Sequence, residues 1–196
     1  PGGLTRALLL EGAGHVIAVE RDTRAIAALG PLIDAADGRL TLIEGDALKL
    51  AVTTLGEMPR RLVANLPYNI ATRLIIDWLR DRLAFESITV MVQKEVGLRL
   101  CADAGEADYG RLSIITGWLA EASIAFEVPA SAFTPAPKVT SALVRLVPRV
   151  EPLFPADRAV LETITAAAFG QRRKMLRASL RSLGGETLLR AADIDP

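Results

Sequence analysis

Short apolar runs, each ended by polar residues, alternate along this chain with segments of helical spacing. The runs 15–20, 40–43, 61–64 and 87–92 have the composition of buried strands. Strands that alternate with helices are typical of an α/β domain. Open α/β sheets bind ligands in the crevice outside the carboxyl ends of their strands. The polar residues that follow each run are therefore the first candidates for function.

Asn65-Leu66-Pro67-Tyr68 follows the third of these runs. A purine exocyclic amine is a poor nucleophile because its lone pair is delocalised into the ring. Two acceptors facing its N–H bonds, the Asn65 side-chain oxygen and a carbonyl near Pro67, favour a more pyramidal nitrogen, and Pro67 itself has a fixed φ and no N–H. Tyr68 can stack on the base. The alternative is a strand-to-helix turn with Asn65 as a cap and Tyr68 covering the core.

Carboxylates follow the first two runs. Glu20 stands where nucleotide-binding α/β sheets place an acceptor for both ribose hydroxyls, or else it caps a helix that begins near Asp22. Gly45-Asp46-Ala47 suits adenine, because Asp46 can accept from the amine and the Ala47 N–H can donate to a ring nitrogen. Aspartate after glycine in a turn is also common for local reasons.

Length and composition limit the alternatives. A chain of 196 residues is long enough for one sizeable α/β domain with a small appendage. No apolar run reaches the roughly 18 residues that span a bilayer, and the single cysteine, Cys101, excludes an intrachain disulfide, so we expect a soluble protein of a reducing cytoplasm. The formal net charge of zero excludes a uniformly basic surface. His15, the only histidine, is interpreted as structural or solvated, and no metal site is predicted.

The C-terminal part is locally basic. Three prolines in 148–155 predict a linker between a larger domain, 1–150, and a helical domain, 151–196, with helices over 157–168 and 169–183. The segment 163–185 has no acidic residue and five basic ones: Arg172, Arg173, Lys174, Arg177 and Arg181. Charged helix faces are commonly only solvated, but the missing counter-charge favours contact with phosphates.

A loop rich in proline, 133–141, separates two strands expected to pair antiparallel at the far edge of the sheet, 124–128 and 141–147. Its sequence, Phe-Thr-Pro-Ala-Pro-Lys-Val-Thr-Ser, predicts an ordered loop able to present Phe133. Alternatively, Phe133 is a hydrophobic plug.

Five segments in order resemble the bacterial small-subunit ribosomal RNA adenine N6,N6-dimethyltransferases over essentially the whole chain. They are 65–72 (Asn-Leu-Pro-Tyr-Asn-Ile-Ala-Thr), 93–96 (Gln-Lys-Glu-Val), 109–113 (Tyr-Gly-Arg-Leu-Ser), the 133–141 loop and 169–177 (Phe-Gly-Gln-Arg-Arg-Lys-Met-Leu-Arg). The resemblance implies a Rossmann-like methyltransferase domain followed by a small helical C-terminal domain. It also implies S-adenosylmethionine as methyl donor, and two adjacent adenines in a terminal loop of small-subunit RNA, in an immature 30S particle, as acceptors. We expect a monomer.

The resemblance also implies roles for individual residues. Those near the cofactor would be Gly2 and Gly3 in the glycine loop, Glu20 at the ribose, Asp46 and Ala47 at the adenine, and Asn65, which borders cofactor and target. At the target, Pro67 would offer its carbonyl to the amine while Tyr68 and Phe133 clamp a flipped adenine. Methyl transfer would be an in-line displacement helped by proximity, without a strong general base.

The ends of the chain depart from the family pattern. That pattern has an N-terminal segment, a first strand and an acidic-x-Gly-x-Gly stretch before the position of Pro1, and its C-terminal domain continues past Pro196. Without the first strand its neighbours would be unpaired and half of the cofactor site would be missing. We therefore expect the chain as given to bind S-adenosylmethionine weakly or not at all.

Three other functions share some of these features. A large-subunit rRNA adenine methylase of the antibiotic-resistance type would use the same Asn65 chemistry, although 133–137 and 169–174 favour the small-subunit enzyme. A non-catalytic ribosome-assembly factor would use only the basic segment. A DNA adenine methyltransferase is disfavoured, because Leu66 stands where such motifs usually have proline.

Overall fold

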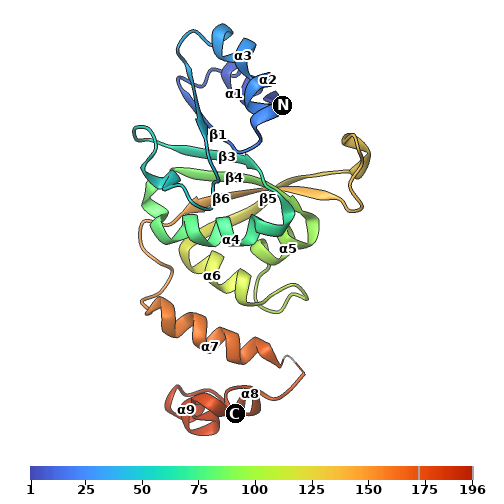
Figure 1. Cartoon of the computed structure of the whole chain (residues 1–196). Coiled ribbons are helices and arrows are strands. Elements are labelled where there is room, and N and C mark those ends of the chain that lie inside the picture. The colour runs from blue at the N-terminus through green and yellow to red at the C-terminus, as the bar shows by residue number, and fades with distance from the viewer. Residues whose placement is uncertain (172, 196) are drawn as a thin grey trace. The chain divides into compact units, whose positions relative to one another are not determined.

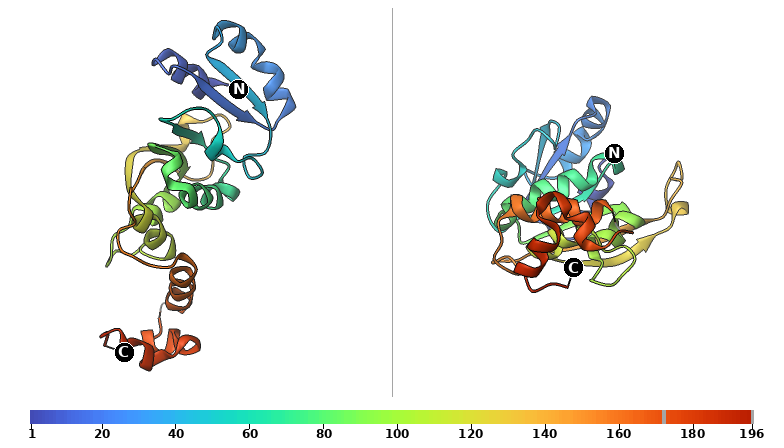
Figure 2. Two further views of the ribbon diagram at one scale, coloured as in Figure 1. Left: turned by 90° about the vertical axis from the view of Figure 1, so that its left-hand side faces the viewer. Right: turned by 90° about the horizontal axis from the view of Figure 1, so that it is seen from below.

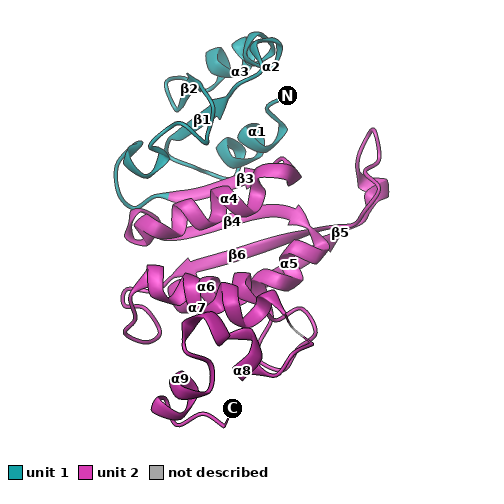
Figure 3. Ribbon diagram, turned by 60° about the horizontal axis from the view of Figure 1, so that its bottom comes forward, with its two compact units in different colours: residues 1–60 teal, residues 61–196 magenta. Residues whose placement is uncertain are grey.

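The computed structural model describes residues 1–171 and 173–195. Internal contacts divide the chain into two compact units, 1–60 and 61–196 (Figure 3). A two-stranded sheet belongs to the first unit and a four-stranded sheet to the second. The expected division into domains 1–150 and 151–196 stays a prediction.

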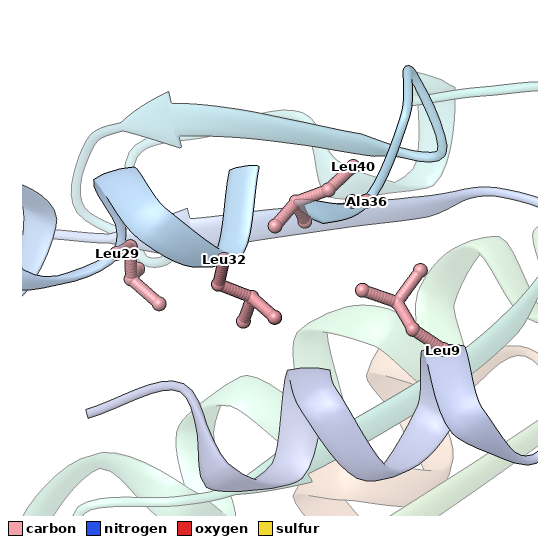
Figure 4. Packing of buried hydrophobic residues seen from close by; sticks show 5 residues of the cluster. All are labelled: Leu9, Leu29, Leu32, Ala36 and Leu40. Carbon is pink, nitrogen blue, oxygen red and sulfur yellow. The ribbon is translucent and has the colours of Figure 1, made fainter. Parts of the chain in front are cut away.

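The first unit pairs its two strands in parallel, with Glu20 opposite Glu44. Five leucine and alanine side chains from its helices and strands form its core (Figure 4): Leu9, Leu29, Leu32, Ala36 and Leu40. Its elements are α1 (Gly3–Leu10), β1 (Val16–Glu20), α2 (Thr23–Ala28), α3 (Gly30–Ala35), β2 (Leu40–Glu44) and the 3-10 helix η1 (Val52–Thr54).

The apolar spacing of 23–34 is that of a single helix, but the structure has two helices there. α2 ends at Ala28 and α3 begins at Gly30, with Leu29 between them. Pro31 stands in the first turn of α3, where its missing N–H costs nothing, whereas inside one continuous helix it would remove a backbone hydrogen bond.

The second unit begins with a mixed sheet in the order β3-β4-β6-β5 (Figure 1). β3 and β4 are parallel, and β6 is antiparallel to both β4 and β5, which confirms the pair expected at the edge. Its elements are β3 (Arg61–Asn65), α4 (Tyr68–Trp78), η2 (Leu79–Ala84), β4 (Ser87–Gln93), α5 (Lys94–Cys101), α6 (Arg111–Leu119), β5 (Ala120–Val128), η3 (Ala130–Ala132) and β6 (Ser141–Pro148).

Alternate residues of the two central strands are completely buried. The apolar side chains of these strands with 0 % exposure are Ile88, Val90, Val92, Ala142, Val144 and Leu146, and Ser141 at the start of β6 is buried to the same extent. A period of two places such residues on one face of a strand, and β4 and β6 are paired so that their buried residues coincide. The helices α4, α5 and α6 contact these strands or their neighbours. The α/β class expected from the sequence is confirmed.

The segment 148–155 is held against α6 rather than hanging free. The Arg149 N–H donates to the Leu119 carbonyl at 2.8 Å, and the Leu153 N–H donates to the Trp118 carbonyl at 2.9 Å. The Trp118 indole N–H donates to the Phe154 carbonyl at 2.7 Å. The proline-containing segment that was predicted as a linker is therefore ordered by hydrogen bonds to the end of α6.

The C-terminal helices are α7 (Arg158–Gly170), α8 (Leu176–Ser179), η4 (Arg181–Leu183) and α9 (Gly185–Ala191). The helix expected over 157–168 is confirmed, with Asp157 as its N-cap accepting from the Val160 N–H at 2.9 Å. The basic helix expected over 169–183 is wrong, because Gln171 has non-helical dihedrals and α8 starts only at Leu176. Gly170 has little helix propensity, so the chain turns there. Among the described residues no helix is long and apolar enough to cross a membrane.

Gly97 sets how closely α5 can approach the sheet. A Cβ atom there would lie 3.1 Å from the Ala142 Cβ and 3.2 Å from a Val144 methyl. We predict that Gly97→Ala lowers the free energy of unfolding by about 1–3 kcal/mol through overpacking. Gly117→Ala in α6, where nothing lies within 4 Å, should be neutral or stabilising, as helix propensity alone demands. Urea denaturation followed by circular dichroism measures both, and equal effects would contradict the prediction.

Candidate functional site

The two candidate carboxylates of the first unit lie at one edge of its sheet. Parallel strands end on the same side, and Glu20 at the end of β1 pairs with Glu44 at the end of β2. The Gly45 N–H donates to the Glu20 carbonyl at 2.9 Å, which extends this pairing into the turn that carries Asp46. Glu20 and Asp46 thus lie at the carboxyl edge where the sequence predicts a ligand site.

Glu20 stabilises the turn after β1, and the helix cap is a different residue. The Glu20 Oε1 atom accepts from the N–H groups of Arg21 at 2.7 Å and Asp22 at 2.9 Å. The N-cap of α2 is Asp22, which accepts from the Arg24 N–H at 2.9 Å. The hydrogen bond from the Arg24 side chain also lowers the pKa of Asp22. The proposed capping role of Glu20 is therefore wrong, and a carboxylate with two bonds still has acceptor capacity for hydroxyls.

Asp46 is held in a local turn. Its Oδ1 atom accepts from the Leu48 N–H at 3.0 Å, and its Oδ2 atom lies 3.7 Å from the Arg21 Nη1 atom. The Arg21 side chain is 79 % exposed, so this long ion pair is well solvated and weak. No hydrogen bond of the Ala47 N–H is found in the described part of the chain. An acceptor beside a donor fits the edge of an adenine, and this assignment stays a prediction.

Packing requires glycine at position 2 but not at position 3. Gly2 has φ 76°, and a Cβ atom there would lie 2.4 Å from a Leu29 methyl. Gly3 begins α1 and has nothing within 4 Å of its Cβ position. Contact of these glycines with a cofactor stays a prediction.

In the second unit, strand register gathers several sequence motifs at one edge. Asn65 ends β3 opposite Met91, and β4 ends at Gln93, which lies opposite Ser141 of β6. The carboxyl ends of β3 and β4 therefore share an edge with the last residues of the loop before β6. Asn65 is exposed at this edge. An exposed amide at a strand end fulfils the first requirement of the predicted catalytic group.

The strand-to-helix turn after Asn65 is short and fixed on both sides. The buried Leu66 donates its N–H to the Met91 carbonyl at 3.3 Å. The Pro67 carbonyl accepts from the N–H groups of Ile70 and Ala71, both at 3.1 Å, in the first turn of α4. A carbonyl oxygen has two lone pairs, so Pro67 has little acceptor capacity left for a target amine.

Tyr68 and Phe133 are both half-buried residues of this unit. The hydroxyl of Tyr68 lies 2.9 Å from the hydroxyl of Ser141, in a hydrogen bond. Phe133 follows η3 in the loop that joins β5 to β6, and the tip of this hairpin extends beyond the sheet (Figures 1 and 2). That the two rings clamp one base stays a prediction.

Lys94 fixes the base of this hairpin. Its N–H donates to the Thr140 carbonyl at 2.9 Å, and its Nζ atom forms an ion pair with Glu127 at 2.8 Å. Lys94 belongs to the Gln-Lys-Glu-Val segment, whose role the sequence did not reveal. It connects the start of α5 to both strands of the hairpin.

The basic segment 163–185 contains no acidic residue of its own. Four of the five predicted residues, Arg173, Lys174, Arg177 and Arg181, are exposed, and none forms an ion pair within the described residues. The fifth, Arg172, lies outside the described residues. The nearby acid Glu186 pairs with Arg190, whose side-chain hydrogen bond lowers the pKa of Glu186. Unpaired cations favour phosphate contact.

Two features were not predicted from the sequence. The rings of Tyr109 and Phe169 pack edge to face with centroids 5.9 Å apart, which joins two of the motifs. Cys101 is half-buried, and burial raises the pKa of its thiol to about 11. A nucleophilic cysteine needs a thiolate, so Cys101 is not a candidate nucleophile.

Carboxylates at the first two strand ends, an exposed Asn65 at the third and a mixed α/β fold are features of a Rossmann-like S-adenosylmethionine-dependent methyltransferase. A solved dimethyladenosine transferase from Plasmodium falciparum matches with a TM-score of 0.80 and 26% identity over 100% of this chain and 72% of that chain. The 23S rRNA methyltransferase ErmE matches with a TM-score of 0.72 and 28% identity over 99% and 78%.

Sequence comparison is more specific. A family model described as ribosomal RNA adenine dimethylase matches residues 1–195. Two relatives named ribosomal RNA small subunit methyltransferase A, from Rhodospirillum rubrum and Rhizobium meliloti, are 58% and 53% identical over all of this chain and 68% and 72% of their own lengths. The chain belongs to the ribosomal RNA adenine dimethylase family.

Substitutions of Gly2 and Gly3 distinguish an effect on packing from an effect on ligand binding. We predict that Gly2→Ala destabilises the protein by about 1–3 kcal/mol, because the new methyl group meets Leu29 and L residues are strained at positive φ. Gly3→Ala should leave stability unchanged, so that any loss of cofactor affinity reports contact rather than misfolding. Urea denaturation and calorimetric titration of S-adenosylhomocysteine measure the two effects. Equal stabilities of the two variants would refute the packing argument.

Proposed function

We propose that this chain transfers methyl groups from S-adenosylmethionine to the N6 atoms of two adjacent adenines in small-subunit ribosomal RNA, as a cytoplasmic monomer that acts on the immature 30S particle. The observation that carries the proposal is the identity of 52–58% over the whole chain to relatives named ribosomal RNA small subunit methyltransferase A. The neighbour named for 23S rRNA is only 28% identical, so the large-subunit alternative has weaker support.

The first unit would hold the methyl donor. Glu20 would accept from the ribose hydroxyls, and Asp46 with the Ala47 N–H would bind the adenine edge. The oxygens of these carboxylates are suitable acceptors, and the link from the Gly45 N–H to the Glu20 carbonyl keeps the two turns together. The bound donor supplies an electrophilic methyl group on a sulfonium. Gly2 and Gly3 would lie near its methionine part.

The second unit would orient the acceptor amine. Asn65 is exposed, and its amide oxygen would accept one N–H of the target N6 group. The second acceptor is more easily supplied by the Leu66 carbonyl, to which no hydrogen bond is found among described residues, than by the occupied Pro67 carbonyl. Both oxygens would align the lone pair toward the incoming methyl group. Tyr68 and Phe133 would hold the base after it leaves its stack, since a buried methyl group cannot be reached otherwise.

Asn65 has a chemical advantage over a carboxylate in this role. A neutral amide oxygen polarises the amine without removing its proton. The nitrogen becomes cationic only when the new C–N bond forms, and it then loses a proton readily to water. The reaction therefore depends on proximity and alignment, and proper alignment alone can lower a barrier by several kcal/mol.

A matched pair of asparagines tests the reaction. Asn65→Ala should lower methyl transfer about 100-fold or more, because one of the fixed hydrogen-bond partners of the reacting group is lost. Asn69→Ala, an exposed asparagine one turn away on α4, should be close to wild type. Transfer is measured with undermethylated 30S and 50S subunits and labelled S-adenosylmethionine at concentrations high enough to offset weak binding. Methylation of 50S alone would favour the resistance-type reaction, and equal rates for both variants would remove Asn65 from the site.

A second matched set tests the RNA surface. Lys174→Gln and Arg177→Gln should each reduce the slope of log affinity against log salt by about 1, because each removes one phosphate contact. Arg190→Gln removes a cation that is already paired with Glu186 at 2.6 Å, so its effect should be much smaller. Filter binding of small-subunit RNA at several salt concentrations gives the slopes. An unchanged slope for both Lys174→Gln and Arg177→Gln would exclude the segment as an RNA contact.

A further inference from the structure

Ser141 has a buried hydroxyl group and is followed in β6 by buried apolar residues. It is the first residue of β6 and has 0 % exposure, as do Ala142 and Val144 after it. β6 lies between β4 and β5, so Ser141 has a strand neighbour on each side, Gln93 and Val128. A hydroxyl buried at this depth requires a hydrogen-bond partner. Its partner is the Tyr68 hydroxyl at 2.9 Å.

This bond fixes the Tyr68 ring at both ends. The Cα atom of Tyr68 is the first of α4, directly after Pro67, whose φ of −58° and carbonyl bonds to α4 define the start of the helix. The hydroxyl oxygen is held by Ser141 on a strand of the sheet. With both ends of the ring axis fixed, only rotation about that axis remains, because this rotation does not move the oxygen.

We propose that Ser141 is a positioning residue that holds the Tyr68 ring at the place where it stacks on the target adenine, while the free rotation about the ring axis lets the ring face align with the base. The inference rests on the proposed function, since it assumes that a base is the ligand of Tyr68. Ser141 itself does not touch the base. It acts through the hydroxyl of Tyr68.

The alternative is that the two hydroxyls only satisfy each other in the core. A comparison with another buried serine of this unit separates the two roles. Ser113, 4 % exposed, donates to the Arg99 carbonyl at 2.7 Å and accepts from the Gly110 N–H at 3.0 Å. Its bonds are to backbone only, and it stabilises the start of α6. Ser141 instead bonds a half-buried aromatic side chain at the edge that carries Asn65.

The test uses the full chain and an RNA hairpin whose loop contains two adjacent adenines, one replaced by 2-aminopurine. Stacking on an aromatic ring quenches 2-aminopurine fluorescence, so quenching at saturation reports whether the ring lies in place against the base, without any methyl donor. Ser141→Ala should lose most of this quenching while RNA affinity, which phosphate contacts dominate, stays nearly unchanged. Ser141→Thr, which keeps the hydroxyl, should restore it, and Ser113→Ala should quench like wild type.

Tyr68→Phe removes the other hydroxyl of the same hydrogen bond and keeps the aromatic ring. It should reproduce the loss seen in Ser141→Ala, and the double variant should lose nothing further, because both changes remove one bond. In the transfer assay each should lower kcat about tenfold with KM for RNA nearly constant, as expected for a misaligned rather than a missing group.

The outcomes are distinct. Wild-type quenching in Ser141→Ala, additive losses in the double variant, or absence of quenching in the wild type would each overturn the role of Ser141. If the variants lose quenching as expected but the wild type methylates neither subunit, the positioning role stands and the proposed reaction fails. If methylation occurs and Ser141→Ala keeps both quenching and kcat, the reaction stands and the positioning role fails.

Discussion

The antiparallel pairing of β6 with β4 determines where the groups of the second unit lie. Ser141 faces Gln93 in this register, so the loop before β6 ends at the edge where β3 and β4 finish. A slip of one residue would exchange the two faces of β6 and turn the fully buried Val144 and Leu146 away from the core. Burial of these side chains therefore keeps Tyr68 within reach of Ser141. Packing in the sheet sets the geometry of a polar site at its edge.

The chemistry divides between charged and neutral groups in a way that suits the proposed reactants. The carboxylates of Glu20 and Asp46, the proposed acceptors for hydroxyls and an amine, are both anchored by backbone N–H groups. The groups proposed to contact the target, the oxygen of Asn65 and the ring of Tyr68, carry no charge. Cations are concentrated in the segment after α7, where Arg173, Lys174, Arg177 and Arg181 form no ion pair within the described residues. The net charge of zero is thus the sum of an acidic region, a neutral region and a basic region.

Local sequence patterns predicted much of this arrangement, and there is a physical reason for each feature that they missed. Strand runs and their polar ends are visible because burial alternates with a period of two. Pro31 and Gly170, which mark the ends of helices, are visible in the sequence too. The prediction nevertheless continued each helix, because the spacing of the apolar residues on both sides was helical. The bond between Tyr68 and Ser141 spans 73 positions and depends on strand register, which no local pattern contains. The sequence likewise could not show that the Pro67 carbonyl is taken by α4, because this depends on where the helix starts.

That helix start also limits the motion of the exposed Asn65, as its proposed role requires. Only Leu66 and Pro67 separate the last residue of β3 from the first residue of α4. Leu66 is buried to 6 % exposure and bonded to β4, while Pro67 is bonded into the helix. The turn is therefore anchored to a sheet on one side and a helix on the other, with no free residue between. Asn65 and Tyr68 flank this turn, so their side chains can face solvent while their backbones are as fixed as the core, which is the condition for aligning an amine without a strong base.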